Sequence, residues 1–575
     1  MRILLVSPPG ADPSVPPASL ATLVACLRRA GHDVSARDLN LEAFLNVFQE
    51  DALAAARQHC EAALCDGEGR ISKRRISAAL LHAPSAMMSL QSALRTSRSP
   101  AEFYRPDRLR LANRVLAQAC ELLSAAHPGI RFGKYSYSML PCGTYEGLEA
   151  ALGQAGPIQD YLSKAVPSFL AVRPDVVGLS VSYFAQLIPA VLLAQLLRQS
   201  APRLHIVAGG AVITWGRHVL RQDPRFSRWF DAAFVGEAEE ALTYYVDALG
   251  RAGSLAAVPN VIRYVDHGVA DQCTTRYVLN LDWPPTPDFA ALPLEHYLAP
   301  EPLVCLTPTR GCYYNRCAFC DYAFTKLAPY HARSPKLVAE DVERITASTG
   351  ARFFCFESDV IRPEDLRQLA AALLGRGLDI RWHGVARFDA GLTGELLGFL
   401  RRSGCVRLYL GLESGSARVL RAMRKDIDLE CASRILRACH EAGIAVEVGV
   451  IVGFPTERPE EAEETVRFVA AHHEFIHRVD VGTFVCLRGS PMACSPEEYG
   501  LTITGESSTQ WSECAFAAPG RPSARAQERV KTRIRALVPD HGGRDVAQDI
   551  LYCAMAPASR LPIRDRHAVP GSHAA

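Results

Sequence analysis

The sequence has little lysine and almost no net charge. Only seven of its 63 basic residues are lysine, and 61 acidic residues leave a formal charge of +2. A near-zero balance argues against a broad electrostatic surface for nucleic acid, so no nucleic-acid partner is expected. Arginine replaces lysine throughout the chain, which a genome-wide codon bias explains more simply than a phosphate-binding role.

Long apolar runs are also missing. No stretch approaches the roughly 18 to 20 apolar residues of a membrane span, and the apolar run at residues 2–6 is too short for a signal peptide. The sequence therefore predicts a cytoplasmic protein with no membrane partner. Its 18 cysteines stay reduced in such a compartment, so the isolated ones are expected to be small buried hydrophobes.

A chain of 575 residues is too long for one core. Residues 1–250 alternate strand and helix patterns, which is typical of a doubly wound α/β domain. Its five expected strands are 2–6, 33–36, 175–182, 204–208 and 231–235. The Ala/Leu/Arg-rich stretch of about 45–165 has helical periodicity and is interpreted as a helical insertion or cap.

The second half begins after a connector, residues 251–300, with a proline-rich exit. Residues 301–495 then alternate regularly, with expected strands at 303–308, 353–358, 381–387, 406–413, 445–453 and 478–485. Six strand–helix units are too few for a closed eight-fold barrel, so an open, partial TIM-type barrel is predicted. Residues 496–575 are interpreted as an extension that ends in a loose tail.

Three cysteines gather directly after the first strand of this predicted barrel. Cys312, Cys317 and Cys320 have the spacing Cys-x4-Cys-x2-Cys, on a loop at the C-terminal mouth where barrel active sites lie. A structural zinc site favours four ligands, and no second cysteine pair lies nearby in the sequence. Three thiolates around a four-iron cluster leave one iron open to a substrate or cofactor. We therefore predict a [4Fe–4S] cluster at these cysteines.

The loop resembles that of the radical S-adenosylmethionine (SAM) superfamily, including the aromatic Phe319 before the third cysteine. It differs from the commonest pattern, which has three residues between the first two cysteines rather than four. The resemblance extends over about residues 300–495, because successive strand ends match positions where such enzymes hold SAM. It implies cofactor contacts from Glu357, Asp359, Arg387, Asp389, Glu413, Ser414, Gly453 and Pro455.

This resemblance also implies the chemistry. The open iron binds the amino and carboxylate groups of SAM, and an electron from a flavodoxin- or ferredoxin-type donor leads to a 5′-deoxyadenosyl radical. The protein then binds and orients the cofactors and excludes water.

The strand ends of the first domain carry glycines and small hydroxyl residues but no Gly-x-Gly-x-x-Gly, which disfavours dinucleotide binding. A doubly wound sheet binds ligands beyond the carboxyl ends of its strands. These loops resemble the cobalamin-binding domain that precedes many radical SAM enzymes. The residues that the resemblance implies are Ser180, Ser182, Gly209, Gly210, Gly236 and Glu237. No Asp-x-His-x-x-Gly motif is present, and residues 565–571 have the wrong spacing, so the resemblance implies cobalt without a histidine ligand.

Together these features lead to the hypothesis of a cobalamin-dependent radical SAM methyltransferase, with the corrin between the two domains. Its substrate would be a small molecule, such as a secondary metabolite, or a peptide. A cobalamin-dependent radical cyclase or rearrangement enzyme would use the same parts. A non-catalytic cobalamin or iron–sulfur sensor is a weaker alternative because a sensor does not need the SAM-pocket pattern. The sequence names no catalytic base and no hydrogen-abstraction site.

Overall fold

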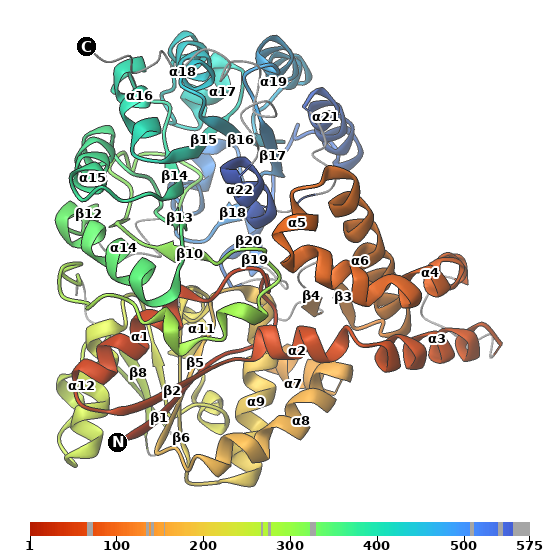
Figure 1. Ribbon diagram of the computed structural model, residues 1–575, viewed down its shortest axis with the longest axis vertical. Helices are drawn as coiled ribbons and strands as arrows, with labels where there is room; N and C mark the ends of the chain where they lie inside the picture. The colour runs from red at the N-terminus through yellow and green to blue at the C-terminus, as the bar shows by residue number, and fades with distance from the viewer. Residues whose placement is uncertain are drawn as a thin grey trace, which may run out of the picture. The chain divides into compact units, whose positions relative to one another are not determined.

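The computed structural model describes residues 1–65, 73–133, 137–139, 143–153, 156–265, 268–273, 278–321, 329–506, 511–538, 544 and 546–555. The chain divides into two compact units (Figure 1). Unit 1 contains residues 1–302, 347–350 and 506–513, and unit 2 contains residues 303–346, 351–505 and 514–575. Within the described residues, no helix combines the length and apolar character that crossing a membrane requires.

Unit 1 is built on a seven-stranded sheet in the order β2-β1-β5-β6-β7-β8-β9. Its parallel strands are β1 (Arg2–Ser7), β2 (Asp33–Asp38), β5 (Val176–Ser180), β6 (His205–Gly209) and β7 (Ala232–Phe234). Helices α1 (Ala18–Arg29), α9 (Leu187–Ser200) and α12 (Glu239–Gly250) connect or follow these strands. The five strands predicted from the sequence are all present.

The prediction of only five strands was wrong, because the connector adds two more. Strands β8 (Val261–Val265) and β9 (Gly268–Asp271) extend the sheet, and both pair antiparallel. Strand β8 is buried only over its first two residues and β9 is not buried. Such an exposed edge gives a weak hydrophobic pattern, which explains why the sequence indicated a connector there.

The chain between β2 and β5 is mostly helical, as its periodicity indicated. It contains α2 (Leu39–Val47), α3 (Glu50–Cys65), α4 (Lys73–Arg98), α5 (Pro100–Phe103), α6 (Pro106–Ala126), α7 (Tyr145–Leu152) and α8 (Gly156–Ala171). A short antiparallel hairpin, β3 (Ile130–Phe132) and β4 (Tyr137–Met139), interrupts this series.

Unit 2 is built on a six-stranded parallel sheet, and every predicted strand is present. The order is β10 (Leu303–Leu306), β13 (Phe353–Phe356), β14 (Arg381–Ala386), β15 (Cys405–Glu413), β16 (Ala445–Val452) and β17 (Arg478–Thr483). Between the strands run α14 (Pro335–Thr349), α15 (Pro363–Gly375), α16 (Gly394–Arg402), α17 (Ala417–Ala422), α18 (Leu429–Glu441) and α19 (Pro459–His472). Because all six strands are parallel, their carboxyl ends lie at one edge of the sheet.

The segment after residue 495 is more ordered than the sequence indicated. A small sheet joins β18 (Cys486–Leu487), β20 (Glu513–Ala517) and β19 (Thr502–Glu506). Two helices follow, α21 (Ala524–Leu537) and α22 (Val546–Met555). The predicted loose tail lies outside the described residues from position 556 onward, as do residues 565–571.

Buried charges anchor α22 in unit 2. The Asp549 carboxylate, 0% exposed, lies 3.4 Å from the guanidinium of Arg407, which is also 0% exposed, and 3.1 Å from His477 Nε2. Arg407 also pairs with Glu447. Removing a buried charge from its partner is costly, so this network fixes the C-terminal helix against β15 and β17.

Candidate active site

The three loop cysteines follow β10 on a segment that is anchored at both ends. Strand β11 (Thr309–Arg310) pairs antiparallel with β12 (His331–Ala332), which returns the chain to the sheet. Cys312, Cys317 and Cys320 are all half-buried. Between the second and third cysteines, the Ala318 N–H donates to the Met423 carbonyl at 2.8 Å. The loop is therefore held in place by unit 2.

Phe319 also holds the cysteine loop in place. It packs against a buried apolar cluster that includes Ala318, Met423, Phe454 and Phe484. Its position beside the third cysteine therefore fixes the loop through burial of apolar surface.

Two of the predicted cofactor-binding carboxylates bind the cysteine loop itself. The Gly311 N–H donates to Asp359 Oδ2 at 2.8 Å, and the Tyr313 hydroxyl donates to Asp389 Oδ2 at 2.9 Å. Asp359 follows β13 and Asp389 follows β14, so the ends of two successive strands hydrogen-bond the residues on either side of Cys312. These two carboxylates therefore position the cysteine loop.

Arg387 brings a positive charge to the same place. Its guanidinium lies 3.7 Å from the ring centroid of Tyr314 and donates to the Asp426 carbonyl at 3.1 Å. The Tyr314 hydroxyl donates to Asp426 Oδ2 at 2.6 Å. Arg387 is only 8% exposed, so the loop and the segment after α17 cover it.

Glu413 occupies a strained position at the end of β15. Its φ of +68° is left-handed, and the pairing register with β16 shifts between Gly411 and Glu413. Such a backbone costs about 1–3 kcal/mol for a residue other than glycine and clusters at functional sites. The strain directs the carboxylate to Lys425, whose Nζ lies 2.9 Å from Glu413 Oε1. A Cβ at Gly411 would lie 2.4 Å from that oxygen, so a larger residue there would displace the Glu413 carboxylate.

The ion pair also affects the nearby thiol. Burial lowers the pKa of Lys425, but the Glu413 carboxylate and Cys317 together more than offset this, so the pKa is raised. Burial raises the pKa of the Cys317 thiol, whereas the cations Lys425 and Arg387 lower it. The net effect is a raised pKa, and the two cations limit the rise.

Ser414 does not face this group. It is fully buried, its hydroxyl accepts from the Ser416 N–H at 3.1 Å, and it contacts the Thr465 hydroxyl at 3.3 Å. Ser414 therefore stabilises the turn between β15 and α17.

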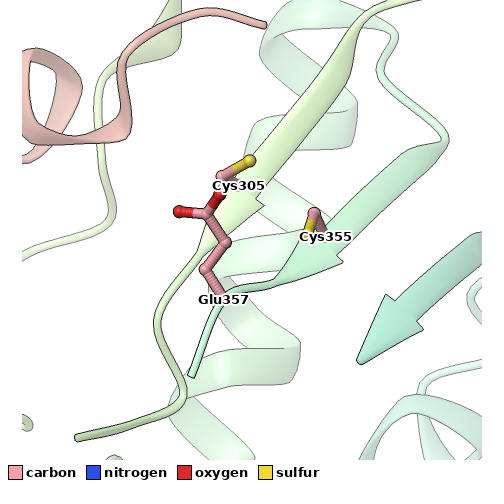
Figure 2. Close-up of side chains that lie close together, drawn as sticks. All are labelled: Cys305, Cys355 and Glu357. Carbon is pink, nitrogen blue, oxygen red and sulfur yellow. The ribbon is translucent and has the colours of Figure 1, made fainter. Parts of the chain in front are cut away.

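Glu357 is exposed and directly follows β13. Its carboxylate approaches the thiols of Cys305 and Cys355 (Figure 2), and Cys355 is one of the isolated cysteines that were expected to be small buried hydrophobes.

Gly453 and Pro455 follow β16, and residues from the C-terminal helix region cover the glycine. Gly453 has a φ of +78°, and a Cβ there would lie 2.7 Å from the side chain of Gln527. Arg521 Nε donates to the Gly453 carbonyl at 2.9 Å, and the Gly453 N–H donates to Glu457 Oε2 at 2.6 Å. The sequence did not indicate Gln527 or Arg521, because nothing local marks a contact across about 70 residues.

The predicted residues of unit 1 lie together at the carboxyl ends of β5, β6 and β7. The Ser180 hydroxyl lies 2.9 Å from that of Ser19, and the Ser182 N–H donates to Gln186 Oε1 at 2.8 Å. The same side chain donates from Nε2 to the Pro8 carbonyl at 2.7 Å, so Gln186 links the loops after β1 and β5. Sequence reasoning missed this buried glutamine because its pattern is that of a helix start.

The glycines here serve the fold as well. Gly210 has a φ of +107°, and a Cβ there would lie 2.5 Å from the Val181 carbonyl oxygen, while a Cβ at Gly209 would lie 3.4 Å from Phe234. At Gly210 the chain therefore approaches itself so closely that a side chain would clash with the backbone. Gly236 has a φ of +79° and donates to Thr214 Oγ1 at 2.8 Å, and Glu237 Oε2 accepts from the Leu279 N–H at 2.7 Å.

Residues 306–469 match the model of the radical SAM superfamily. An uncharacterized methyltransferase of Pyrococcus horikoshii is 26% identical over 300 residues, covering 51% of this chain and 64% of that protein. An anaerobic magnesium-protoporphyrin IX monomethyl ester cyclase of Cereibacter sphaeroides is 27% identical, covering 54% of this chain and 51% of that protein. A hopanoid C-3 methylase of Methylococcus capsulatus is 23% identical, covering 48% of this chain and 53% of that protein. The chain thus spans about half to somewhat under two thirds of the length of these curated relatives.

Two solved structures share the fold over much of the chain. The radical SAM methyltransferase TsrM from Kitasatospora setae, with tryptophan substrate and a SAM analogue bound, is 14% identical with a TM-score of 0.56, covering 94% of this chain and 89% of that one. The cobalamin-dependent SAM radical enzyme OxsB, with aqua-cobalamin and SAM bound, is 17% identical with a TM-score of 0.53, covering 64% and 59%.

Proposed function

Because residues 306–469 place this chain in the radical SAM superfamily, we propose that it is a cobalamin-dependent radical SAM methyltransferase. In this proposal the six-stranded sheet of unit 2 is a partial TIM-type barrel, and unit 1 is a Rossmann-like cobalamin-binding domain. The observation that carries the proposal is the cysteine loop, which the ends of β13 and β14 hold through Asp359 and Asp389.

The donor set fits a [4Fe–4S] cluster. Cys312, Cys317 and Cys320 are half-buried thiols on one anchored loop, and Arg387 and Lys425 provide positive charge beside Cys317. Such cations would offset the negative charge of a cluster with three cysteine ligands.

SAM would bind beside this loop through polar groups at the strand ends. Glu413 and Arg387 end β15 and β14, where a carboxylate and a guanidinium suit the amino and carboxylate groups of the methionine moiety. Gly453 and Pro455 follow β16 where the resemblance implies the adenine, and Gln527 and Arg521 cover Gly453 on one side. Asp359 and Asp389 each also accept a hydrogen bond from the cysteine loop.

Cobalamin is proposed for the carboxyl edge of the sheet in unit 1. The order β2-β1-β5-β6-β7 has its switch point at β1 and β5, and ligands of such sheets bind beyond the carboxyl ends. The backbone of Gly10 approaches Ala185 so closely that a Cβ would lie 2.7 Å away, which closes the chain across the switch point. On the other side of the switch point, beyond β5 to β7, Ser182 is half-buried and Tyr183 is 57% exposed. We propose that the corrin binds there, beside these accessible residues.

When bound, the cluster supplies the electron that cleaves SAM to a 5′-deoxyadenosyl radical, and cobalamin supplies a methyl carrier. The chain's own residues orient these groups and exclude water. We expect the anaerobically reconstituted protein, given SAM and a reductant, to produce 5′-deoxyadenosine. With substrate present, S-adenosylhomocysteine should accumulate alongside it. A protein with full iron content that yields neither product would contradict the proposal and would favour a sensor.

The cobalamin site has a test of its own. Ala211 is exposed and follows Gly210 at the start of the short helix after β6. We expect Ala211→Trp to prevent cobalamin uptake while leaving iron content unchanged, because the bulk enters space outside the fold. Gly210→Leu, in contrast, should disturb the β5 loop itself. Equal cobalamin uptake by Ala211→Trp and the parent would exclude the carboxyl edge of this sheet as the cobalamin site.

A radical cyclase is the second candidate, favoured by the 27% identity to the magnesium-protoporphyrin ester cyclase. It would release 5′-deoxyadenosine without stoichiometric S-adenosylhomocysteine, which separates the two activities. In either case we propose a small-molecule or peptide substrate and an external flavodoxin- or ferredoxin-type electron donor.

A further inference from the structure

The solvent side of α4 carries two large apolar side chains. Leu81 and Met88 are 76% and 87% exposed. They lie seven residues apart, which is about two helical turns, so they project from the same face. The opposite face, which includes Ile76 and Leu90, is buried where α4 packs against α3 and α6 (Figure 1). The exposed pair therefore takes no part in the packing of these three helices.

The exposed positions around this pair are small and uncharged. They are, in chain order, Ser77, Ala78, Pro84, Ser85 and Ser92. The solvent face of a helix normally carries charged and polar side chains. A face with two apolar side chains among small residues instead suits another helix, because small side chains let two helix axes approach each other.

Arginines mark both ends of this face. Arg74 and Arg95 are exposed, and they continue the seven-residue spacing of Leu81 and Met88 in both directions. The two arginines are separated by about 32 Å along the helix axis. Helix α4 contains no aspartate or glutamate. Any partner that covers the apolar pair therefore meets positive charge at both ends of the contact.

Segments of this chain that follow α4 do not offer the complementary charge. Glu102 lies 3.6 Å from Arg108, and Asp107 lies 3.6 Å from Arg105, so these carboxylates already face cations. The last residues of the sequence, 556–575, contain three arginines and one aspartate. Their net positive charge does not match this face.

A second copy of this chain is also a poor match. In an antiparallel pair with a two-fold axis between Leu81 and Met88, each Arg74 would meet Arg95 of the other copy. In a parallel pair, each arginine would meet its own equivalent. Juxtaposed like charges oppose association, so the pattern favours a different chain with carboxylates at these two places.

We propose that the α4 face, defined by Arg74, Leu81, Met88 and Arg95, docks an acidic amphipathic helix of a peptide or protein partner. The partner packs apolar side chains against Leu81 and Met88 and places carboxylates beside the two arginines. A membrane surface fits less well, because interfacial helices use a broad apolar face with aromatic residues. Helix α4 has no Phe, Tyr or Trp. The face belongs to unit 1, and the proposal does not depend on methyl transfer.

The test uses the full chain and a synthetic, fluorescently labelled peptide. The peptide is an alanine-based helix of about 24 residues, with two leucines seven positions apart and glutamates at both ends. Fluorescence anisotropy measures binding. We expect saturable binding to the parent that weakens with added salt. The double variants Arg74→Glu with Arg95→Glu, and Leu81→Ser with Met88→Ser, should each bind at least about tenfold more weakly.

A charge swap makes the test specific. The same peptide with lysine in place of glutamate should bind the Arg74→Glu, Arg95→Glu variant more tightly than it binds the parent. Arg203→Glu changes an exposed arginine in the turn before β6 and is the matched control, so it should bind the acidic peptide as the parent does. All substituted side chains are exposed, and far-ultraviolet circular dichroism should show that every variant folds.

Four results would overturn the proposal. The first is a parent that shows no saturable binding of the acidic peptide, and the second is equal affinity in the parent and both double variants. The third is a parent dimer in sedimentation that Leu81→Ser with Met88→Ser converts to monomer, which would assign the face to a second copy. The fourth is binding to phosphatidylserine–phosphatidylcholine vesicles that the same variant loses, which would assign it to a membrane.

Discussion

The hydroxyl of Tyr313 donates a hydrogen bond to the Asp389 carboxylate at 2.9 Å, which ties the residue after Cys312 to the end of β14. Burial and that carboxylate both raise the pKa of Tyr313, so the phenol stays protonated and remains a donor. The residue after Cys312 and the end of β14 are thus held together by this hydrogen bond.

Tyr313→Phe should therefore lower iron loading and weaken SAM binding together. A hydrogen bond to a charged group contributes about 1.5–3 kcal/mol, or more than tenfold in an equilibrium constant. Asp389→Asn keeps an acceptor and should retain more iron than Tyr313→Phe. Iron per chain and SAM affinity measure both effects, and parent-like values in Tyr313→Phe would show that the loop is held elsewhere.

Cys317→Ala should lose the cluster and all SAM cleavage while the fold survives. The loop remains anchored through Ala318 and Gly311, so the far-ultraviolet circular dichroism should match the parent. Full iron content and 5′-deoxyadenosine formation after anaerobic reconstitution of this variant would end the cluster assignment. Cys431→Ala, which changes a buried thiol of α18, provides the control.

Glu413 should be needed for SAM but not for the cluster, whereas Arg387 should be needed for both. We expect Glu413→Gln to weaken SAM binding while the cluster spectrum is unchanged, and Arg387→Ala to weaken SAM binding and also lower iron loading, because its guanidinium stacks on Tyr314 of the loop. Glu413→Gln also leaves Lys425 without its anion, so the variant should be less stable. The double variant Glu413→Gln with Lys425→Met should recover stability but not SAM affinity. SAM affinity equal to the parent in both single variants would show that the pocket is misplaced.

Glu457 should make unit 2 less stable as pH rises. Burial raises the pKa of this carboxyl to about 7, although it accepts a hydrogen bond from the Gly453 N–H. The folded state therefore holds a proton that the unfolded chain loses near pH 4.5, and stability falls between about pH 4.5 and 7, then levels off. The effect is at most about 3 kcal/mol. Urea unfolding of parent and Glu457→Gln at pH 5 and pH 8 tests this; an equal pH dependence in both would contradict it.

Asp549→Asn should be strongly destabilising. Burial raises the pKa of Asp549, but His477, Arg407 and Arg544 more than offset this and hold it well below its usual range. Removing the carboxylate charge leaves Arg407 buried with an incomplete set of anions, which costs about 3–5 kcal/mol. The urea midpoint measures the loss. Arg407→Met combined with Asp549→Leu should recover most of it, and a midpoint unchanged in Asp549→Asn would mean that α22 is not held by charge.

The sequence predicted what depends on local patterns. The six strands of unit 2 and the five parallel strands of unit 1 have clear periodicity, and the cysteine spacing identifies the loop by itself. The sequence did not predict that β8 and β9 extend the first sheet, because β9 is an exposed edge. It also gave no sign that Asp549, Arg521 and Gln527 complete unit 2, since those contacts join segments about 70 or more residues apart.

The roles of individual residues were harder to predict than their positions. Asp359 and Asp389 occupy the expected strand ends but bind the loop, and Gly210 accommodates the Val181 carbonyl. A strand-end carboxylate or glycine looks the same in sequence whether its neighbour is a ligand or the chain itself. Only the register and the dihedral angles distinguish these cases.

Trp511 belongs to unit 1 although it lies roughly 200 residues beyond the end of that unit's main segment. It is 2% exposed, donates to the Gly143 carbonyl at 3.1 Å, and packs so closely that a Cβ at Gly216 would lie 2.0 Å from its ring. During synthesis at about 5–20 residues per second, the first unit must therefore wait about 10–40 s for its last core residue. Until that indole arrives, the nascent unit exposes the apolar surface that Trp511 later covers.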